Sequence, residues 1–314
     1  YDVFDYESHY LWSKKTNDVL ELLKKTGKFY FDKDNRVVLD QKGFGLGMKM
    51  PVLVLTRGDG TSLYALRDIA YTLDKVSKGE NIWVLGEDHK LYYEQIKVAL
   101  LMLGKKVPRV IFYSFVLLDE GKMSTRKGNL VLLEDFMAEA EKKAQQELKR
   151  RYKKIDKKAA KIIAHGALKY SILKVSPEKN VTFNWQQSLS FEGETAPYIQ
   201  YAYARISSII KKHKKALSKK ADFSLLNKKE EIELIKKLAI FPDIVEKTSK
   251  ELRPNTVATY AYELAKLFNE FYHVHNILKE ESKIKQARLL LALSVKQTLK
   301  NSLNLLGIDV LEKM

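Results

Sequence analysis

The sequence of 314 residues contains no cysteine, which excludes disulfide bonds and thiolate metal sites and favours a reducing compartment, so we expect a cytoplasmic protein. It also lacks any uninterrupted apolar run of the roughly 18 residues that cross a membrane, and we expect no membrane contact. Neither a starting methionine nor a signal-peptide pattern is found at Tyr1, so we expect the C-terminal portion of a longer protein. With 45% apolar and 30% charged residues, the composition is that of a globular protein with room for two domains.

Acidic residues are scarce relative to basic ones: 39 Asp and Glu stand against 56 Lys and Arg, which gives a net charge of +17. The excess is concentrated in two stretches, residues 142–161 with ten basic side chains and residues 211–220 with six lysines. Such patches suit a polyanion because each phosphate contact releases condensed counterions. The alternative is that lysine-rich helix faces merely keep the protein soluble. Charge alone favours nucleic-acid binding without excluding this alternative.

The first half of the chain alternates between strand-like and helix-like segments. A helix is predicted for residues 17–25, and a hairpin for 29–31 with 36–39. Apolar runs and helical spacing then predict three buried strands separated by two helices, in the order 52–55, 61–77, 81–85, 91–103 and 110–118. This order implies parallel pairing in a doubly wound α/β sheet. Thr61 or Ser62 is expected to cap the first of the two helices.

Polar groups lie next to these expected strands, where such a sheet binds its ligands. Tyr64 and Asp68 stand four apart on one helix and so share a face, where a carboxylate beside a phenol suits a planar cation. Alternatively, Asp68 pairs with Arg67 or a lysine, and Tyr64 is plain core. A turn with two acids and His89 follows the second strand, but a metal site there has little support because no second histidine stands at ligand spacing.

A basic loop flanked by glycines, residues 121–129, follows the third expected strand. Its cations and hydroxyls belong to Lys122, Ser124, Thr125, Arg126 and Lys127. Glycine lets the backbone approach a ligand closely, and lysine and arginine suit phosphate oxygens. The loop therefore predicts a phosphate site, with a solvated basic turn as the alternative.

The second half reads as an α-helical bundle, and no strand is expected after Asn129. The predicted helices cover residues 133–151, 157–173, a stretch from 197 onward, 229–241, 257–278 and 283–306. On the helix that begins at Pro197, an apolar stripe leaves Gln200, Tyr203 and Lys211 on other faces. Aromatic side chains are interleaved with the charges, as on surfaces that stack RNA bases, although each such ring taken singly belongs more often to a core.

Four segments, in chain order, resemble signatures of the arginyl-tRNA synthetases, a family of class I aminoacyl-tRNA synthetases. They are D-G-T-S-L-Y-A-L-R-D-I-A-Y at 59–71, V-L-G-E-D-H at 84–89, K-M-S-T-R-K-G-N at 122–129 and P-Y-I-Q-Y-A-Y-A-R at 197–205. Residues 288–314, which end in E-K-M, are similar to the C-terminal helix of that family. The resemblance thus extends over essentially the whole chain.

This resemblance implies an α/β fold followed by an all-α part, in three regions. Residues 1–134 would be part of a class I Rossmann-like parallel sheet, 135–196 a helical connector that contacts the tRNA stem, and 197–314 an α-helical anticodon-binding domain. The implied reaction joins L-arginine to tRNA-Arg through arginyl-adenylate, with ATP and Mg²⁺ as co-substrate, without zinc, in a monomeric protein. Charge builds up on the phosphates in such a transition state, which explains the need for a cationic loop.

The resemblance also implies roles for particular residues. The arginine pocket would contain Tyr64, Asp68 and His89. ATP would be bound by Lys122, Met123 and Ser124, and the catalytic loop residues would be Lys122, Ser124, Arg126 and Lys127. Thr125 stands where the general class pattern has a second lysine, so Arg126 or Lys127 would supply that charge. Contacts to tRNA would come from Tyr198, Gln200, Tyr201, Arg205 and Lys211.

One motif of the class is not found in the sequence. None of the six histidines forms the His-x-Gly-His motif that class I synthetases use to hold the ATP phosphates. We expect this motif upstream of Tyr1, so that the chain alone forms arginyl-adenylate poorly. The alternative is a tRNA-binding paralogue without chemistry of its own, or one half of a split synthetase.

Overall fold

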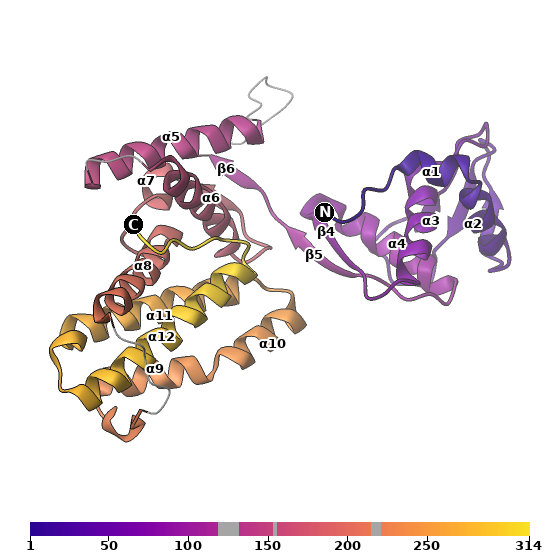
Figure 1. Cartoon of the computed structure of the whole chain (residues 1–314). Helices are drawn as coiled ribbons and strands as arrows, with labels where there is room; N and C mark the ends of the chain where they lie inside the picture. Colours follow the sequence, from indigo (N-terminus) through magenta and orange to yellow (C-terminus); the bar gives the residue numbers. More distant parts are fainter. Residues whose placement is uncertain (119–131, 153–155, 215–220) are drawn as a thin grey trace. The chain divides into compact units, whose positions relative to one another are not determined.

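The computed structural model describes residues 1–118, 132–152, 156–214 and 221–314, and the chain divides into two compact units (Figure 1). The first unit runs from Tyr1 to Tyr113 and the second from Ser114 to Met314. The first mixes strands with helices, and the second is mostly helical, as the sequence predicts. Among the described residues, no helix has both the length and the apolar character required to span a membrane.

An antiparallel sheet of three strands forms one part of the first unit. Its strands are β1 (Phe29–Phe31), β2 (Val37–Asp40) and β3 (Val52–Val54), in this order. The predicted hairpin is therefore confirmed, but the assignment of 52–55 to a parallel sheet is wrong, because β3 pairs antiparallel with β2. The loop between them returns the chain directly to β2, where the backbone N–H of Gln41 donates to the carbonyl oxygen of Pro51 at 2.8 Å. Such a short return favours an antiparallel neighbour.

The parallel part of the first unit is the pair β4 (Ile82–Gly86) and β5 (Arg109–Tyr113). Helix α4 (Lys90–Met102) connects them, which confirms the predicted strand–helix–strand crossover. The first unit also contains α1 (Glu7–Trp12), α2 (Lys15–Lys24), α3 (Tyr64–Val76) and the 3₁₀ turn η1 (Glu87–His89). Its core joins the antiparallel sheet to the helices through fully buried side chains, among them Leu23, Leu39, Leu55, Leu66, Ile69 and Leu100.

In the part of the chain that the structure describes, the second unit begins with a small sheet and three helices. Strand β6 (Val116–Leu118) pairs in parallel with β7 (Val181–Phe183), and the helices are α5 (Leu133–Tyr152), α6 (Lys157–Leu173) and α7 (Trp185–Ser188). The expectation that no strand follows Asn129 is therefore wrong. The predicted strand 110–118 is likewise divided, since its first part, β5, pairs with β4 and its last part pairs with β7. Backbone bonds at Ser114 and Phe115 connect this segment with residues 177–181.

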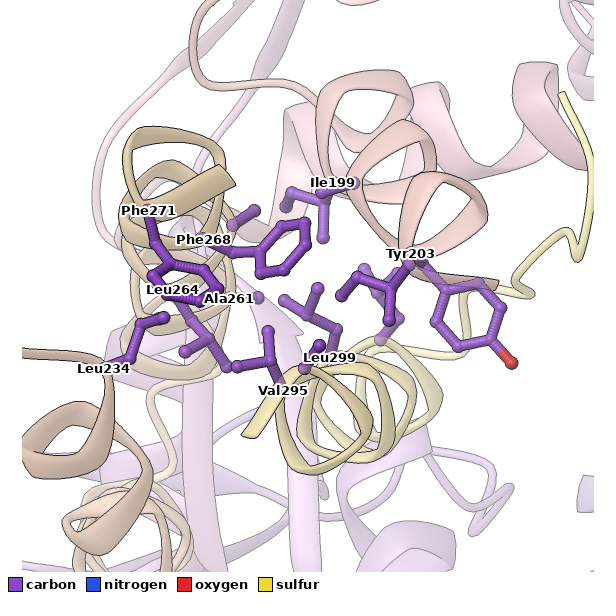
Figure 2. Close-up of a cluster of buried hydrophobic side chains, with 14 of the residues drawn as sticks. Ile199, Tyr203, Leu234, Ala261, Leu264, Phe268, Phe271, Val295 and Leu299 are labelled. Atoms are coloured by element: carbon purple, nitrogen blue, oxygen red, sulfur yellow. The ribbon is translucent and has the colours of Figure 1, made fainter. Parts of the chain in front are cut away.

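Among the described residues, five helices complete the second unit: α8 (Ala196–His213), α9 (Lys229–Ala239), α10 (Phe241–Glu251), α11 (Asn255–Val274) and α12 (Ser282–Leu305). Short 3₁₀ turns precede α9 and α12, at Phe223–Leu225 and Ile277–Lys279. Figure 2 shows the interior of this bundle, where Ile199 of α8 lies with Phe268 and Leu264 of α11 and Leu299 of α12. These side chains are fully buried, so the packing of apolar faces stabilises the bundle.

Candidate functional site

The N-terminus of α3 is positioned by a tight turn whose ends form an isolated antiparallel bridge, Thr56 with Ser62. The expected side-chain cap by Thr61 or Ser62 is wrong, since Leu63 occupies the N-cap position and no side chain caps the helix. Instead, the backbone N–H and the hydroxyl of Thr61 both donate to the carboxylate of Asp59. The polar groups of Thr61 and Asp59 are thus paired within the turn. Helix α3 starts at Tyr64, and no side chain caps its first turn.

Asp68 of α3 accepts a hydrogen bond from the hydroxyl of Tyr92, which lies on α4. The ring of Tyr92 lies 5.0 Å from that of Tyr64, at an interplanar angle of 49°. The ring of His89 meets Tyr92 edge-on at 6.2 Å. Tyr92 therefore stands between the three residues that the sequence assigns to an arginine pocket and brings them into one cluster.

The surroundings of Asp68 disfavour the charged form of its carboxyl group. Burial raises its pKa, and the neighbouring Glu7 adds to this rise, while the hydrogen bond from Tyr92 and the charge of Arg67 act in the opposite direction. Burial and the nearby carboxylate also raise the pKa of Tyr92, so its hydroxyl keeps the proton that it donates. A desolvated carboxylate of this kind is stabilised by a cation that brings its own hydrogen-bond donors.

A cavity of about 290 Å³ lies beside Asp68 on the side of the N-terminal segment. Its lining combines three carboxylates and three tyrosines with one arginine: Asp5, Glu7, Asp68, Tyr6, Tyr10, Tyr71 and Arg67. The guanidinium of Arg67 pairs with Glu7 and also donates to the carbonyl oxygen of Ser62 at 2.7 Å. The guanidinium of Arg67 therefore already has partners in Glu7 and Ser62. Because three carboxylates face this one arginine, the cavity keeps an excess of negative charge.

Sequence reasoning missed six of the side chains around Asp68: Asp5, Tyr6, Glu7, Tyr10, Tyr71 and Tyr92. Two of them carry a spacing signal, because Tyr71 follows Asp68, and Tyr92 follows His89, by three helical positions. The other four belong to the opening stretch of acids and aromatics, residues 1–10, whose packing on α3 is not visible in local spacing. Tyr64 and His89, in contrast, lie toward Tyr92 and are not among the side chains that line this cavity.

The alternative metal site near His89 gains no support within the described residues. No group of three or more His, Asp or Glu side chains there has an arrangement that could hold a metal ion. His89 lies 3.8 Å from Asp88, while Glu87 pairs with Lys90 across one helical turn. These acids belong to local ion pairs at the start of α4.

The predicted phosphate loop lies outside the described residues, which end at Leu118 and resume at Leu132. Its members stay predictions: Lys122, Met123, Ser124, Thr125, Arg126 and Lys127.

Helix α8 presents only part of the predicted RNA-contacting set to solvent. Gln200 is fully buried, and its side-chain amide donates to the carbonyl oxygen of Asp309 at 2.8 Å, which argues against an RNA contact. Tyr203 is also buried and belongs to the bundle core, so the expectation that it lies off the apolar face of the helix is wrong. Tyr198 and Tyr201 are partly exposed, and Lys211 is exposed. The cause is packing on several sides, since α6, α11 and α12 all contact α8.

Arg205 forms the centre of a second polar site. Its guanidinium lies 4.7 Å from the ring centre of Tyr201 and 5.5 Å from that of Tyr272, and it donates to Asn269 at 2.6 Å. A cavity of about 270 Å³ adjoins it, lined by Tyr201, Ala204, Arg205, Ser208, Ile209, Lys212, Tyr272, Leu278 and Met314. A fixed cation between two tyrosine rings beside an open cavity suits a planar, electron-rich group such as a nucleotide base.

Helix α5 carries a further basic surface in the second unit. Arg150 and Arg151 both pair with Glu147, and the hydrogen bond from Arg150 holds the pKa of that carboxyl below its usual range. The guanidinium of Arg151 lies 4.4 Å from the ring centre of Phe191, and Lys143 lies 5.5 Å from a ring of Trp185. Cations interleaved with aromatic rings are typical of a nucleic-acid surface.

Two protein-family models match the chain. Residues 1–185 match the model described as tRNA synthetases class I (R), catalytic domain, and residues 199–314 match the DALR anticodon binding domain. Together these matches confirm the predicted order of a class I catalytic part and a helical anticodon-binding part.

Similar proteins carry corresponding names. The chain is 42% identical to an arginine–tRNA ligase of Methanocella arvoryzae over 100% of its own length and 56% of that protein. It is 44% identical to an arginine–tRNA ligase of Methanocaldococcus jannaschii, over 98% and 54%. The solved arginyl-tRNA synthetase of Thermus thermophilus superposes with a TM-score of 0.86 at 26% identity, over 96% of this chain and 58% of that one. The chain thus spans about half the length of the curated relatives that it matches.

Proposed function

The chain belongs to the arginyl-tRNA synthetase family, and on this basis we propose that it takes part in the ATP-dependent joining of L-arginine to tRNA-Arg. The contact of Tyr92 with the partly buried carboxylate of Asp68 supports this most directly. A guanidinium is a planar cation with forked donors, and it matches a carboxylate flanked by tyrosine rings better than a lysine ammonium does. Asp68 then binds the substrate side chain, with Tyr64 and His89 at the edge of the site.

The acidic cavity beside Asp68 fits the rest of the substrate. Arginine carries a second cation, its α-ammonium group, and the carboxylates of Asp5 and Glu7 add negative charge to the cavity. Bound arginine would neutralise a cavity that otherwise concentrates like charges, so its binding is electrostatically favourable. In this proposal the chain's own residues bind and orient the amino acid, and they hold no resident metal.

ATP and its phosphates are assigned to the loop of residues 121–129 by resemblance. Lys122, Ser124, Arg126 and Lys127 would contact the phosphates, with Met123 beside the nucleotide, and Arg126 or Lys127 would replace the second lysine of the class pattern. Mg²⁺ would arrive bound to ATP as part of that co-substrate. The fixed positive charge of such a loop lowers the cost of the charge that develops on the leaving pyrophosphate.

The second unit is proposed to bind tRNA-Arg. A base of the anticodon loop would stack against or be clamped by Tyr201, Arg205 and Tyr272. Tyr198 and Lys211, which also lie on α8, would make further contacts. The basic surface of α5 would follow the phosphate backbone of a stem. The boundaries 1–134, 135–196 and 197–314 stay our proposal for the catalytic part, connector and anticodon-binding domain, and we further propose a monomer in the cytoplasm.

Arginine binding to the chain tests the first part of the proposal. We expect L-arginine to bind, and L-citrulline, which has the same shape without the charge, to bind at least about 100-fold more weakly, because the partly buried carboxylate of Asp68 loses its charged partner. Isothermal titration calorimetry of the full chain measures both ligands. Equal affinity for the two would contradict the guanidinium pocket.

The ligase reaction is tested in the same experiment series by charging of tRNA-Arg. Because the sequence has no His-x-Gly-His motif, we propose that the chain alone charges tRNA-Arg poorly. A separately produced polypeptide, covering the part of the Methanocaldococcus jannaschii relative that the chain does not match, is then added. We expect activity to rise on addition. Robust charging by the chain alone would overturn the proposed inactivity. If the chain binds arginine but tRNA-Arg is not charged with or without the added polypeptide, the non-catalytic alternative is favoured.

Arg205 provides a test of the RNA-binding part. Replacing Arg205 with lysine keeps the charge but removes the planar group that lies between Tyr201 and Tyr272. We expect the affinity for a tRNA-Arg anticodon hairpin to fall about 5- to 100-fold, the effect of losing one stacked base contact. Fluorescence anisotropy measures this affinity.

The matched control for Arg205 is the same substitution at Arg253, whose guanidinium pairs with Glu178 in the same unit. Arg253→Lys is expected to leave hairpin affinity within about twofold, the small effect typical of an exposed ion pair. Equal losses in both variants would show that binding depends on overall charge and would contradict a specific role for Arg205.

A further inference from the structure

The last eight residues of the chain, 307–314, are tied to both cores of the second unit. Gly307 ends α12 with a φ of 66°, and its carbonyl oxygen accepts a hydrogen bond from Lys169 of α6. Ile308 is buried in the bundle core, while Leu311 and Met314 pack against the core formed by α5, α6 and their neighbours. The segment 307–314 is therefore held by contacts to α6 and to both cores.

Glu312 supplies the polar attachment within this segment. Its carboxylate accepts a hydrogen bond from the hydroxyl of Tyr203 at 2.7 Å and from the ammonium group of Lys296 at 2.8 Å. Figure 2 shows the Tyr203 hydroxyl oxygen pointing away from the labelled core residues. Burial acts to raise the pKa of Glu312, but hydrogen bonds from Lys296, Tyr203 and Ser207 lower it to about 2. The carboxylate is therefore charged at neutral pH, although its side chain is 68% exposed to solvent.

Met314 lies two residues beyond this attachment and lines the cavity next to Arg205. The same cavity is bounded by Tyr201 and Tyr272, the two rings on which Arg205 lies. A thioether adapts its shape to an aromatic group and makes favourable contacts with it. Met314 thus adds a flexible apolar side chain to a cavity that Ile209 and Leu278 also line, beside its aromatic and cationic side chains.

We propose that Glu312 is a positioning residue for RNA: by fixing the segment 307–314 to Tyr203 and Lys296, it holds Met314 as one wall of the cavity that receives an unstacked nucleotide base. This inference rests on the proposed tRNA-binding function and deepens it. Glu312 itself carries negative charge, which repels phosphates, so its benefit to RNA binding comes through Met314. Removing an acid from an RNA-binding surface would by itself strengthen binding.

A double-mutant cycle tests the proposal. Glu312→Ala and Met314→Ala are each expected to weaken binding of the anticodon hairpin about 5- to 10-fold, and the double variant by no more than the stronger single variant, because both remove the same wall. Glu246→Ala, which removes an equal charge from an exposed ion pair on α10, serves as control and is expected not to weaken binding. Additive losses in the double variant, or no loss for Glu312→Ala, would overturn the proposal.

A second measurement needs no RNA, so it tests the positioning of Met314 by Glu312 independently of the proposed tRNA binding. The chain contains six methionines, so a ¹³C-methyl spectrum is simple, and Met314→Leu identifies the Met314 signal. In Glu312→Ala we expect this signal to move toward the position of an exposed methionine, with the helical circular dichroism and melting temperature unchanged. An unmoved signal would overturn the positioning role. If the wild-type chain fails to bind the hairpin, the RNA function fails, while the spectrum still decides whether Glu312 places Met314.

Discussion

Replacing Asp68 with asparagine is expected to weaken arginine binding by about two to three orders of magnitude. Loss of one partner of a buried, hydrogen-bonded charge pair costs about 2–5 kcal/mol, and the amide cannot offer two anionic oxygens to a guanidinium. The substitution keeps the shape of the side chain, and its oxygen can still accept the hydrogen bond of Tyr92. Calorimetric titration of arginine into the wild-type chain and the variant measures the difference. Unchanged affinity would contradict the assignment of Asp68 to the guanidinium.

The same substitution is expected to leave the free energy of unfolding unchanged or slightly higher at neutral pH. The pKa of Asp68 is raised in the folded chain, so above the ordinary value of 3.8 the folded state binds more protons than the unfolded state, and stability falls as the pH rises through the raised pKa. Asparagine has no charge to desolvate and removes this cost. Urea unfolding measures the stability of the wild-type chain and the variant. Weaker arginine binding at unchanged stability distinguishes a functional residue from a structural one.

The pH dependence of arginine affinity completes this prediction. A protonated Asp68 cannot pair with a guanidinium, so the affinity of the wild-type chain falls as the pH is lowered through the raised pKa. In Tyr92→Phe, a hydrogen bond that lowers this pKa is missing, and the fall is expected to begin at a higher pH. The phenylalanine ring still packs against Tyr64, so the affinity at neutral pH drops by only about tenfold, the effect of one hydrogen bond to a charged group. Asp68→Asn should show no such pH dependence.

Local sequence signals predicted the parts of this site that lie within one helix. Tyr64 and Asp68 stand four apart, and their shared face on α3 follows from helical geometry alone. Spacing from His89 marks Tyr92 as its neighbour, but it does not reveal the contact with Asp68, a residue 24 positions away. That contact joins two helices and depends on how α3 and α4 pack. The acids of residues 1–10 escaped for the same reason, since only the folded chain brings them beside α3.

The errors in the fold have a related physical origin. An apolar run such as 52–55 indicates a buried strand, but it contains no information on whether the neighbour is parallel or antiparallel. Strand β7 has only three residues, and its partner β6 precedes it by more than 60 residues, so no local pattern marks it. The predicted helix 229–241 ends at Ala239 in the structure, and α10, which starts at Phe241, was not predicted from the sequence. Pro242 lies in the first turn of α10, where its missing N–H costs nothing.

Gln200 shows why helical spacing cannot settle burial. The apolar stripe on α8 predicts one buried face, and Gln200 stands off that stripe. In the structure α8 lies among α6, α11 and α12, so polar positions between the apolar ones are enclosed as well. The side-chain NH₂ group of Gln200 donates there to carbonyl oxygens of residues 162 and 309, contacts that connect α6 and residues 307–314 to α8. Its Oε1 atom is buried and has no hydrogen-bond partner among the described residues. Candidate RNA contacts on a central helix therefore have to be checked against its neighbours.

The helical bundle contains a buried ion pair whose disruption is expected to have a large effect on stability. Glu231 is fully buried at the start of α9, where its carboxylate accepts hydrogen bonds from the backbone N–H of Lys228 at 2.9 Å and from the guanidinium of Arg288 at 2.7 Å. Arg288, on α12, also donates to Glu280 at 2.6 Å. One arginine thus joins the start of α9 to α12 and to the segment that precedes α12.

Replacing Arg288 with methionine is expected to lower the free energy of unfolding of the second unit by about 3–5 kcal/mol, because it leaves the carboxylate of Glu231 buried without its partner. The double variant Arg288→Met with Glu231→Gln should recover most of that loss: it removes both charges, and the glutamine oxygen still accepts from the N–H of Lys228, which preserves the helix cap. Guanidinium unfolding of the full chain, followed by helical circular dichroism, measures the shift in midpoint at constant slope. A single variant as stable as the wild type, or a double variant less stable than the single one, would show that the charge of Glu231 is not what makes Arg288 necessary.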